Sequence, residues 1–441
     1  MAFLTSSDKA LWHLALPMIF SNITVPLLGL VDTAVIGHLD SPVYLGGVAV
    51  GATATSFLFM LLLFLRMSTT GLTAQAYGAK NPQALARALV QPLLLALGAG
   101  ALIALLRTPI IDLALHIVGG SEAVLEQARR FLEIRWLSAP ASLANLVLLG
   151  WLLGVQYARA PVILLVVGNI LNIVLDVWLV MGLHMNVQGA ALATVIAEYA
   201  TLLIGLLMVR KILKLRGISG EMLKTAWRGN FRHLLALNRD IMLRSLLLQL
   251  CFGAITVLGA RLGSDIIAVN AVLMTLLTFT AYALDGFAYA VEAHSGQAYG
   301  ARDGSQLLDV WRAACRQSEI VALLFSVVYL LAGEHIIALL TSLTQIQQLA
   351  DRYLIWQVIL PLVGVWCYLL DGMFIGATRA AEMRNSMAVA AAGFALTLLT
   401  LPWLGNHGLW LALTVFLALR GLSLAAIWRR HWRNDTWFVA T

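Results

Sequence analysis

Four long stretches of the chain contain no Asp, Glu, Lys or Arg residue, namely 10–31, 41–65, 136–158 and 385–419. A helix needs about 20 mostly apolar residues to cross the hydrocarbon layer of a membrane, and each stretch is long enough. Charged residues make up only 12% of the 441 positions, against about a quarter in soluble domains. These features exclude a soluble globular domain and predict an all-α protein that crosses a membrane many times.

Apolar runs bounded by Gly, Pro, Asn and charged residues predict twelve transmembrane helices. The stretch 385–419 is too long for one helix, and Gly405-Asn406-His407 divides it into two. The first span follows a short polar lead without a small-residue cleavage site, so we expect a retained helix and not a signal peptide. The predicted spans are 11–36, 43–72, 89–118, 127–155, 161–182, 187–210, 236–262, 266–292, 315–340, 352–377, 385–404 and 408–429.

Lys and Arg residues gather in the connections after the even-numbered spans and at the C-terminus. The turns on the other side, at 37–42, 183–186 and 405–407, contain neither residue type. The positive-inside rule therefore predicts that both termini are cytoplasmic. The same asymmetry accounts for the formal net charge of +7, so we do not expect nucleic acid as a partner.

The chain contains an internal repeat. Gln-Ala-Tyr-Gly at 75–78 recurs at 297–300, and Leu-Ala-Leu at 14–16 recurs at 235–237, with offsets of 222 and 221 residues. Because six spans lie within this interval, the two halves have the same predicted orientation, as in a parallel repeat.

The repeat predicts three parts of the chain. They are an N-terminal six-helix lobe at 1–212, a basic cytoplasmic linker at 213–233 and a C-terminal six-helix lobe at 234–441. Two similar lobes can enclose a cleft and rock against each other, which is typical of secondary transporters. A single-path channel is more often built from one bundle or a ring of subunits.

Carboxyl groups at membrane depth are costly and are candidates for function. In the N-terminal half they are Asp32 in the first predicted span and Asp176 in the fifth. Asn172 and Asn169 precede Asp176 by one and about two helical turns and share its face. Asn22 and Asn145 extend this predicted polar cluster. Burial disfavours the charged form of a carboxyl, so Asp32 and Asp176 are candidates for proton coupling. The alternative is that each is a hydrogen-bonded structural carboxyl.

Pro26 lies near the middle of the first span, six residues before Asp32. Proline removes one backbone hydrogen bond and loosens the preceding turn. A helix weakened there can bend when the charge of Asp32 changes. A static kink that only improves packing explains Pro26 equally well.

The C-terminal half carries different acids. Asp285 lies in the eighth span, Glu292 follows it by seven residues on the same helix face, and Asp371 lies in the tenth span. We treat these three as secondary candidates, because structural pairing, for instance with Arg244 or Arg66, is the favoured role for them.

The sequence lacks the motifs of nucleophilic, metal-dependent and nucleotide-dependent enzymes. The three cysteines have no metal-ligand spacing. We therefore expect no enzymatic activity, no cofactor and no metal site. Without a nucleotide-binding motif, uphill transport would have to use an ion gradient.

Several of these motifs together resemble the multidrug and toxic compound extrusion (MATE) family. They are Leu16-Pro17-Met18, the run Val31–Gly37, the repeated Gln-Ala-Tyr-Gly, and Asn172 with Asp176. Leu284-Asp285-Gly286-Phe287 with Glu292 resembles the family's DinF-like branch. The resemblance covers essentially the whole chain. It implies twelve helices in two lobes of six around a central cleft, with Asp32 as the protonation site and Asn172 and Asp176 as its partners.

The resemblance also implies cation-coupled efflux of organic, amphiphilic or cationic compounds across a bacterial inner membrane. Other branches of the family use a Glu in the seventh helix for sodium. This chain has no carboxylate between Arg244 and Asp265, which favours protons over sodium. The expected partners are small organic molecules and membrane lipids, and the expected state is a monomer. A flippase for a lipid-linked precursor, sodium-coupled efflux and a membrane sensor or scaffold remain alternatives.

Overall fold

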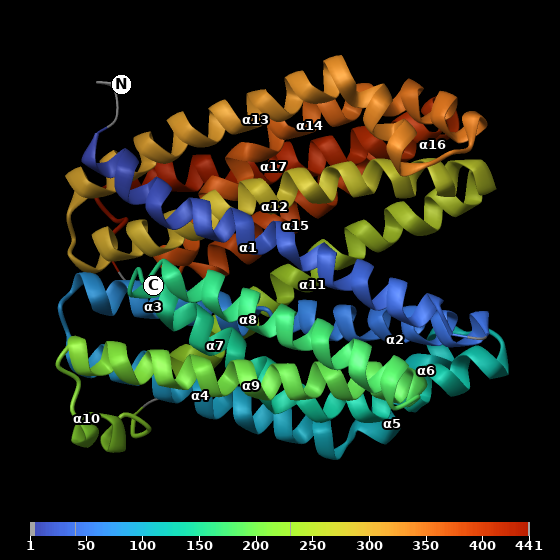
Figure 1. Ribbon diagram of the computed structural model, residues 1–441. Coiled ribbons are helices and arrows are strands. Elements are labelled where there is room, and N and C mark those ends of the chain that lie inside the picture. The colour runs from blue at the N-terminus through green and yellow to red at the C-terminus, as the bar shows by residue number, and fades with distance from the viewer. Residues whose placement is uncertain (1–4, 40, 230, 440–441) are drawn as a thin grey trace. The chain divides into compact units, whose positions relative to one another are not determined.

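The computed structural model describes residues 5–39, 41–229 and 231–439, with the backbone alone for residues 24–33. The described chain is helical almost throughout, and no strand occurs in those ranges. The predicted all-α class is therefore confirmed. Figure 1 shows long helices that are joined mostly by short connections at their ends.

The chain forms two compact units. The N-unit is Ile23–Leu234, and the C-unit combines the chain up to Asn22 with the part from Leu235 onward. The boundary falls inside α1 (Ser6–Gly37), so this helix begins in the C-unit and ends in the N-unit. The lobe limits predicted from the repeat stay a prediction.

The helices of the N-unit beyond α1 alternate with short connections. They are α2 (Pro42–Leu61), α3 (Phe64–Gly78), α4 (Pro82–Leu105), α5 (Arg107–Val118), α6 (Glu122–Arg135), η1 (Trp136–Ser138), α7 (Ala139–Gly154), α8 (Arg159–Asp176), η2 (Val177–Gly182), α9 (Asn186–Leu215) and α10 (Gly220–Thr225). Those that follow are α11 (Arg232–Arg261), α12 (Ser264–Gly300), α13 (Gly304–Leu340), α14 (Thr344–Gly376), α15 (Ala380–Thr397), η3 (Leu398–Thr400), α16 (Leu401–Leu404) and α17 (Asn406–Arg433).

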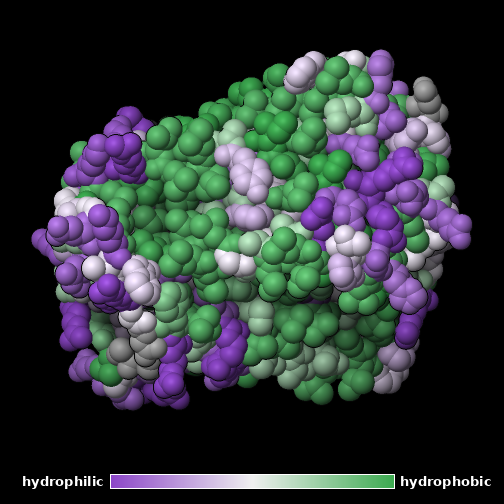
Figure 2. Space-filling model, turned by 90° about the horizontal axis from the view of Figure 1, so that it is seen from below, coloured by the Kyte–Doolittle hydropathy of each residue, from purple (hydrophilic) through white to green (hydrophobic). Residues whose placement is uncertain are grey.

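Eleven helical segments in the described part of the chain are long and apolar enough to cross a membrane. They match the second to twelfth predicted spans one for one. The first predicted span falls on α1, which includes the residues described by backbone alone. On the face shown in Figure 2, hydrophobic side chains cover a broad area and hydrophilic ones gather mainly towards the ends. A wide apolar surface of this kind is stable only in contact with lipid or another apolar surface.

In each half, the repeated Gln-Ala-Tyr-Gly motif is the end of a helix, and the residues directly after it form the turn and the cap of the next helix. Lys80 follows the end of α3 with φ 53°, and Arg302 follows the end of α12 with φ 54°. The next residue then caps the following helix: Asn81 Oδ1 accepts a hydrogen bond from Ala84 N at 3.2 Å, and Asp303 Oδ1 accepts one from Gln306 N at 3.1 Å. Left-handed turns and Asx caps are standard helix-end devices, so the repeat preserves the geometry of the connection.

Each unit also contains a pair of glycines spaced four apart that brings two helices into backbone contact. A Cβ on Gly150 of α7 would lie 2.6 Å from the carbonyl oxygen of Arg66 in α3. A Cβ on Gly372 of α14, 222 positions later, would lie 2.7 Å from the carbonyl oxygen of Ala288 in α12. Gly154 and Gly376 complete the pairs and pack equally tightly. In a membrane the hydrophobic effect does not drive helices together, because lipid tails are as apolar as the side chains. Small residues at this spacing allow the close packing that holds the helices together instead.

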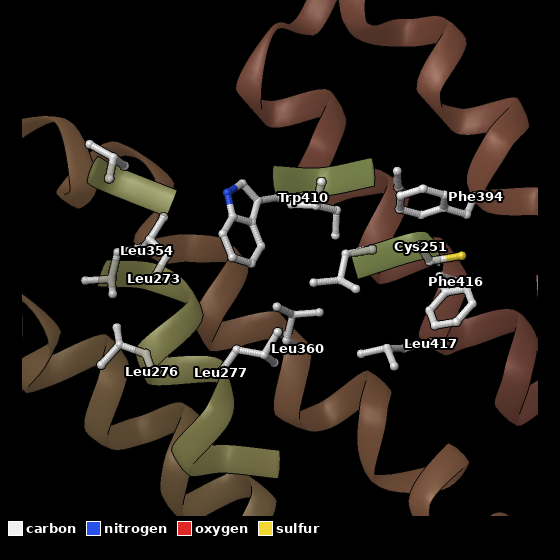
Figure 3. Packing of buried hydrophobic residues seen from close by; sticks show 14 of the residues in the cluster. Cys251, Leu273, Leu276, Leu277, Leu354, Leu360, Phe394, Trp410, Phe416 and Leu417 are labelled. Carbon is white, nitrogen blue, oxygen red and sulfur yellow. The ribbon is translucent and has the colours of Figure 1, made fainter. Parts of the chain in front are cut away.

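The main apolar core of the C-unit combines side chains from six helices, α11 to α15 and α17. Figure 3 shows Cys251 of α11, Leu273 of α12, Leu360 of α14, Phe394 of α15 and Trp410 of α17 converging in one region. Phe394 and Phe416 pack edge to face with centroids 6.1 Å apart. Tyr329 and Ile337 of α13 belong to the same cluster, so the core joins elements that are far apart in sequence.

The connection between the halves packs on the N-unit. Ile218 and Ala226, on either side of α10, are buried in a cluster with α4, α7 and α9. Gln91 Nε2 of α4 donates a hydrogen bond to the carbonyl of Ala226 at 3.4 Å. The described part of the predicted linker at 213–233 is therefore an ordered part of this unit.

The start of α1 is held on the C-unit by a buried carboxylate. Thr5 and Asp8 form a capping box, in which Thr5 N donates to Asp8 Oδ2 at 2.9 Å and Asp8 N donates to Thr5 Oγ1 at 3.2 Å. The Arg316 guanidinium of α13 donates to both Asp8 oxygens at 2.9 and 3.0 Å. Burial raises the pKa of Asp8, but the hydrogen bonds from Thr5 and Arg316 outweigh burial and bring it below the usual 3.8.

Gly376→Ala tests the backbone contact in the C-unit. The new Cβ would meet Ser295 Oγ at 2.5 Å and the backbone of Gly296 and Glu292 within 2.9 Å. We expect a loss of about 1–3 kcal/mol, as for overpacked cores, measured as a lower melting temperature in detergent. Gly253→Ala is the control, because no atom lies within 4 Å of its Cβ position. Equal melting temperatures for Gly376→Ala and the native protein would contradict this packing.

Asp8→Ala tests the anchor of α1. Because the folded-state pKa of Asp8 lies below the unfolded value, its stabilisation is complete above about pH 3.8 and is lost as the pH falls. We expect Asp8→Ala to melt at a lower temperature than the native protein at pH 7, with the difference shrinking below pH 3.8. Asp309→Ala on α13, an exposed position, serves as the control. A difference that does not depend on pH would contradict the ionic role.

Candidate functional site

A buried polar pair lies at the end of α8. Asp176 is fully buried and Asn172, one turn earlier, is 3% exposed. Asn172 Nδ2 donates to Thr194 Oγ1 of α9 at 3.3 Å, and Thr194 Oγ1 donates to the carbonyl of Ala190 at 3.2 Å. Asn169, two turns before Asp176, is half-buried on the same helix. The predicted face of α8 therefore turns towards α9.

A π-helical turn begins directly after Asp176. It covers Val177–Gly182, whereas α8 up to Asp176 is a regular α-helix. Such turns shift the hydrogen-bonding register of the backbone and occur frequently at functional sites. The sequence analysis did not predict this turn, because a π register has no clear residue pattern.

Asn145 lies beside a second acid of the N-unit. Its Nδ2 atom donates to Glu198 Oε2 at 3.0 Å and to the Glu198 carbonyl at 3.1 Å. Glu198 follows Thr194 by one helical turn, so α9 presents both residues on one face. The sequence analysis missed Glu198, although it is the only charged residue between 186 and 209. That isolation within a predicted span was the available signal.

Three other predicted residues of the N-terminal half lie elsewhere or outside the described side chains. Asn22 belongs to the C-unit, where its Nδ2 donates to the carbonyl of Tyr282 in α12 at 3.1 Å. Asn22 therefore belongs to a different compact unit from Asn172 and Asn145. Asp32 and Pro26 lie on the helical backbone of α1, but their side chains are outside the described residues.

The C-unit contains a buried ion-pair triad. Asp371 of α14 accepts a hydrogen bond from Arg244 of α11 at 2.6 Å and one from Arg420 of α17 at 2.5 Å. The three residues are 8%, 6% and 4% exposed. The Arg420 guanidinium also lies over the Phe416 ring, 5.6 Å from its centroid. The pairing of Asp371 with Arg244, weighed as the structural alternative, is present.

Two positive partners give Asp371 a different chemistry from a free carboxylate. Its negative charge is compensated twice over at hydrogen-bond distance, so a further cation would be repelled by two guanidinium groups. Arg420 was missed in the sequence analysis, although it is the only Asp, Glu, Lys or Arg between 406 and 428. Its partner could not be named from spacing, because Arg420 and Asp371 are on different helices.

Asp285 and Glu292 share one face of α12. Glu292 is 3% exposed and Asp285 is half-buried. Arg66, the other pairing partner considered from sequence, lies in α3 of the N-unit and donates to Thr70 Oγ1 at 3.3 Å. Across the described residues, no three His, Cys, Asp or Glu side chains are arranged to hold a metal ion.

The comparisons agree with this architecture. The family model described as MatE matches residues 17–178 and 241–404. The chain belongs to the MatE family. Its two matched segments cover corresponding parts of the two halves. The MATE-like fold implied by the motif resemblance is thus confirmed, and the chain is a multi-pass membrane transporter of this family.

Individual relatives extend over the whole chain. It is 98% identical over 441 residues to DNA damage-inducible protein F of Escherichia coli strain K12, covering 100% of this chain and 96% of that protein. It is 23% identical to the probable multidrug resistance protein NorM of Acinetobacter baylyi, covering 97% and 96%. A crystal structure of MATE in the straight conformation matches with a TM-score of 0.85 at 20% identity, covering 98% and 97%. Another in the bent conformation matches with a TM-score of 0.84 at 20% identity, covering 98% and 96%.

Asp371→Asn tests the triad of this MatE-family chain. The amide leaves two buried guanidinium groups without a counter-charge, and breaking a buried ion pair costs about 3–5 kcal/mol. We expect a clearly lower melting temperature and less folded protein by size-exclusion chromatography. Asp303→Asn is the matched control, because Asn and Asp cap helices equally well. An unchanged melting temperature for Asp371→Asn would show that the ion pairs do not stabilise the C-unit.

Proposed function

We propose that this chain is a proton-coupled antiporter that exports organic, amphiphilic or cationic compounds across the bacterial inner membrane. The observation that carries the proposal is the different setting of two buried aspartates, Asp176 in the N-unit and Asp371 in the C-unit. Asp176 is fully buried beside Asn172, which bonds to a hydroxyl of α9. Asp371 is held between two guanidinium groups.

This contrast supports assigning the coupling to the N-unit. Adding a proton to a buried carboxyl removes the cost of burying its charge, whereas the charge of Asp371 is already compensated by Arg244 and Arg420. Asp176 and, by sequence, Asp32 are the proposed proton carriers, with Asn172 and Asn169 as supporting groups. Glu198, hydrogen-bonded to Asn145, is a further candidate polar group on the neighbouring helix.

The position of α1 supports a mechanical role for Pro26. The boundary between the two compact units lies at Asn22–Ile23, four residues before Pro26, on the helix that carries Asp32. A helix with one backbone hydrogen bond missing bends there more easily than elsewhere. We propose that protonation of Asp32 changes the bend of α1 and thereby the affinity for substrate.

The energetics are sufficient for efflux. At a potential of about 150 mV, one entering proton supplies about 3.5 kcal/mol from the electrical term. This free energy sustains a substrate gradient of a few hundred-fold, since about 1.4 kcal/mol corresponds to a factor of ten.

The triad also bears on the choice of ion. A sodium site in the C-unit would use carboxylate oxygens as ligands, and those of Asp371 already accept hydrogen bonds from Arg244 and Arg420. Protons are therefore proposed over sodium.

The proposal also includes a monomeric protein with both termini in the cytoplasm. The orientation of the termini follows from the Lys and Arg distribution of the sequence.

Asp32→Asn in proteoliposomes with an imposed pH gradient tests the mechanism. We expect the variant to insert normally and to lose pH-driven efflux across a panel of fluorescent organic cations. Asp303→Asn, which changes an exposed cap residue, should transport normally. Efflux by Asp32→Asn at the native rate would refute the assignment. Efflux driven by an imposed sodium gradient, without a pH gradient, would favour sodium coupling instead.

A further inference from the structure

A groove with a volume of about 520 Å³ lies between α13 and α17 at one end of the C-unit. Both helices pack on α14, which contributes the buried Leu370 to the lining. This end carries the C-terminus of α17 and the start of α13. The groove is lined by Trp311, Leu370, Ala425, Trp428, Arg429, Trp432 and Arg433.

Three half-buried tryptophans form the apolar wall of the groove. The Trp311 and Trp428 rings have centroids 5.7 Å apart, and those of Trp428 and Trp432 are 5.6 Å apart. The Trp428 indole Nε1 is buried without a hydrogen-bond partner among the described residues. An unpaired donor of this kind is costly in apolar surroundings, so a ligand acceptor at this position would be favourable.

Two arginines flank the tryptophans. Arg429 and Arg433 are one helical turn apart on α17, and both are exposed. Within the described chain no carboxylate forms an ion pair with either of them. Arg379, at the same end of the C-unit, differs because it is buried and donates to Glu382 and to three C-terminal carbonyls. The groove therefore combines an apolar wall with two positive charges available to a ligand.

The position along α17 places this combination at the membrane surface. About 20 helical residues cross the hydrocarbon layer, which is the number from Leu409 to Trp428. Trp residues prefer the interface between hydrocarbon and headgroups, and Arg residues just beyond it face the headgroup phosphates. The apolar part of the groove is then level with acyl chains, and its arginines are level with phosphates.

We propose that this groove binds an anionic phospholipid of the cytoplasmic leaflet. Arg429 and Arg433 hold the phosphate by charge-assisted hydrogen bonds, and an acyl chain lies along Trp311 and Trp428. The two unpaired arginines favour an anionic over a zwitterionic headgroup. The apolar lining favours a lipid over free phosphate. The site belongs to the C-unit alone and does not depend on the coupling mechanism.

The test measures lipid retention by the purified full-length protein. The protein is equilibrated in detergent micelles with equal amounts of phosphatidylglycerol and phosphatidylcholine, and bound lipid is quantified by native mass spectrometry. We expect the native protein to retain phosphatidylglycerol preferentially, and Arg429→Ala/Arg433→Ala to lose this preference at least five-fold. Arg429→Lys/Arg433→Lys should keep part of it, because the charge remains.

Lys211→Ala/Lys214→Ala is the matched control, since it removes two exposed positive charges from the end of α9. Its lipid preference should equal that of the native protein, and all variants should have similar melting temperatures. An equal loss of lipid preference in this control would show that the preference depends on the total positive charge of the protein and not on the groove. Displacement of bound lipid by millimolar inorganic phosphate would identify a phosphate site instead. Full retention by the alanine variant would overturn the proposal.

Discussion

Hydrocarbon offers no hydrogen-bond partners to a peptide backbone, so each segment that crosses it has to satisfy its own N–H and C=O groups. Every other feature of this protein follows from that constraint. The chain is helical almost throughout its described residues, and its irregular backbone is confined to short connections. Helix caps such as Asn81 and Asp303 satisfy the backbone groups where a helix starts outside the membrane.

Because lipid is as apolar as leucine, contacts between such helices depend on close fit. The glycine pairs Gly150–Gly154 and Gly372–Gly376 provide this fit in corresponding places of the two units. The two halves have therefore kept the same backbone geometry: the left-handed turn after Gln-Ala-Tyr-Gly, the Asx cap of the next helix, and the close helix contact at the glycine pair. Side chains that carry charge were free to diverge: Asp176 lies at the end of α8, whereas Asp371 lies in α14 between two arginines.

This divergence gives the two units different chemistry on a common scaffold. In the N-unit, Glu198 is accompanied by the Asn145 amide, and Asn172, one turn before the buried Asp176, bonds to the Thr194 hydroxyl. In the C-unit, Asp371 is accompanied by arginines. The first arrangement suits a change of charge during transport, and the second suits a constant charge that ties α11, α14 and α17 together. Helix α1, with its two ends in different units, is where the proposed change of charge would act on both.

The hydropathy of the sequence by itself determined the all-α class and the approximate positions of the second to twelfth spans, and its motifs indicated the family. This was possible because lipid imposes a length and composition that single segments reveal. The same applied to Asp176 with Asn172, which share a helix face at a spacing of four. Tertiary structure alone decided which partner each polar group takes. The bonds of Asp371 with Arg420, Asn145 with Glu198 and Asn22 with Tyr282 join residues 49 to 260 positions apart. Helical periodicity specifies the face on which a side chain lies, but only the packing of helices specifies what it meets there.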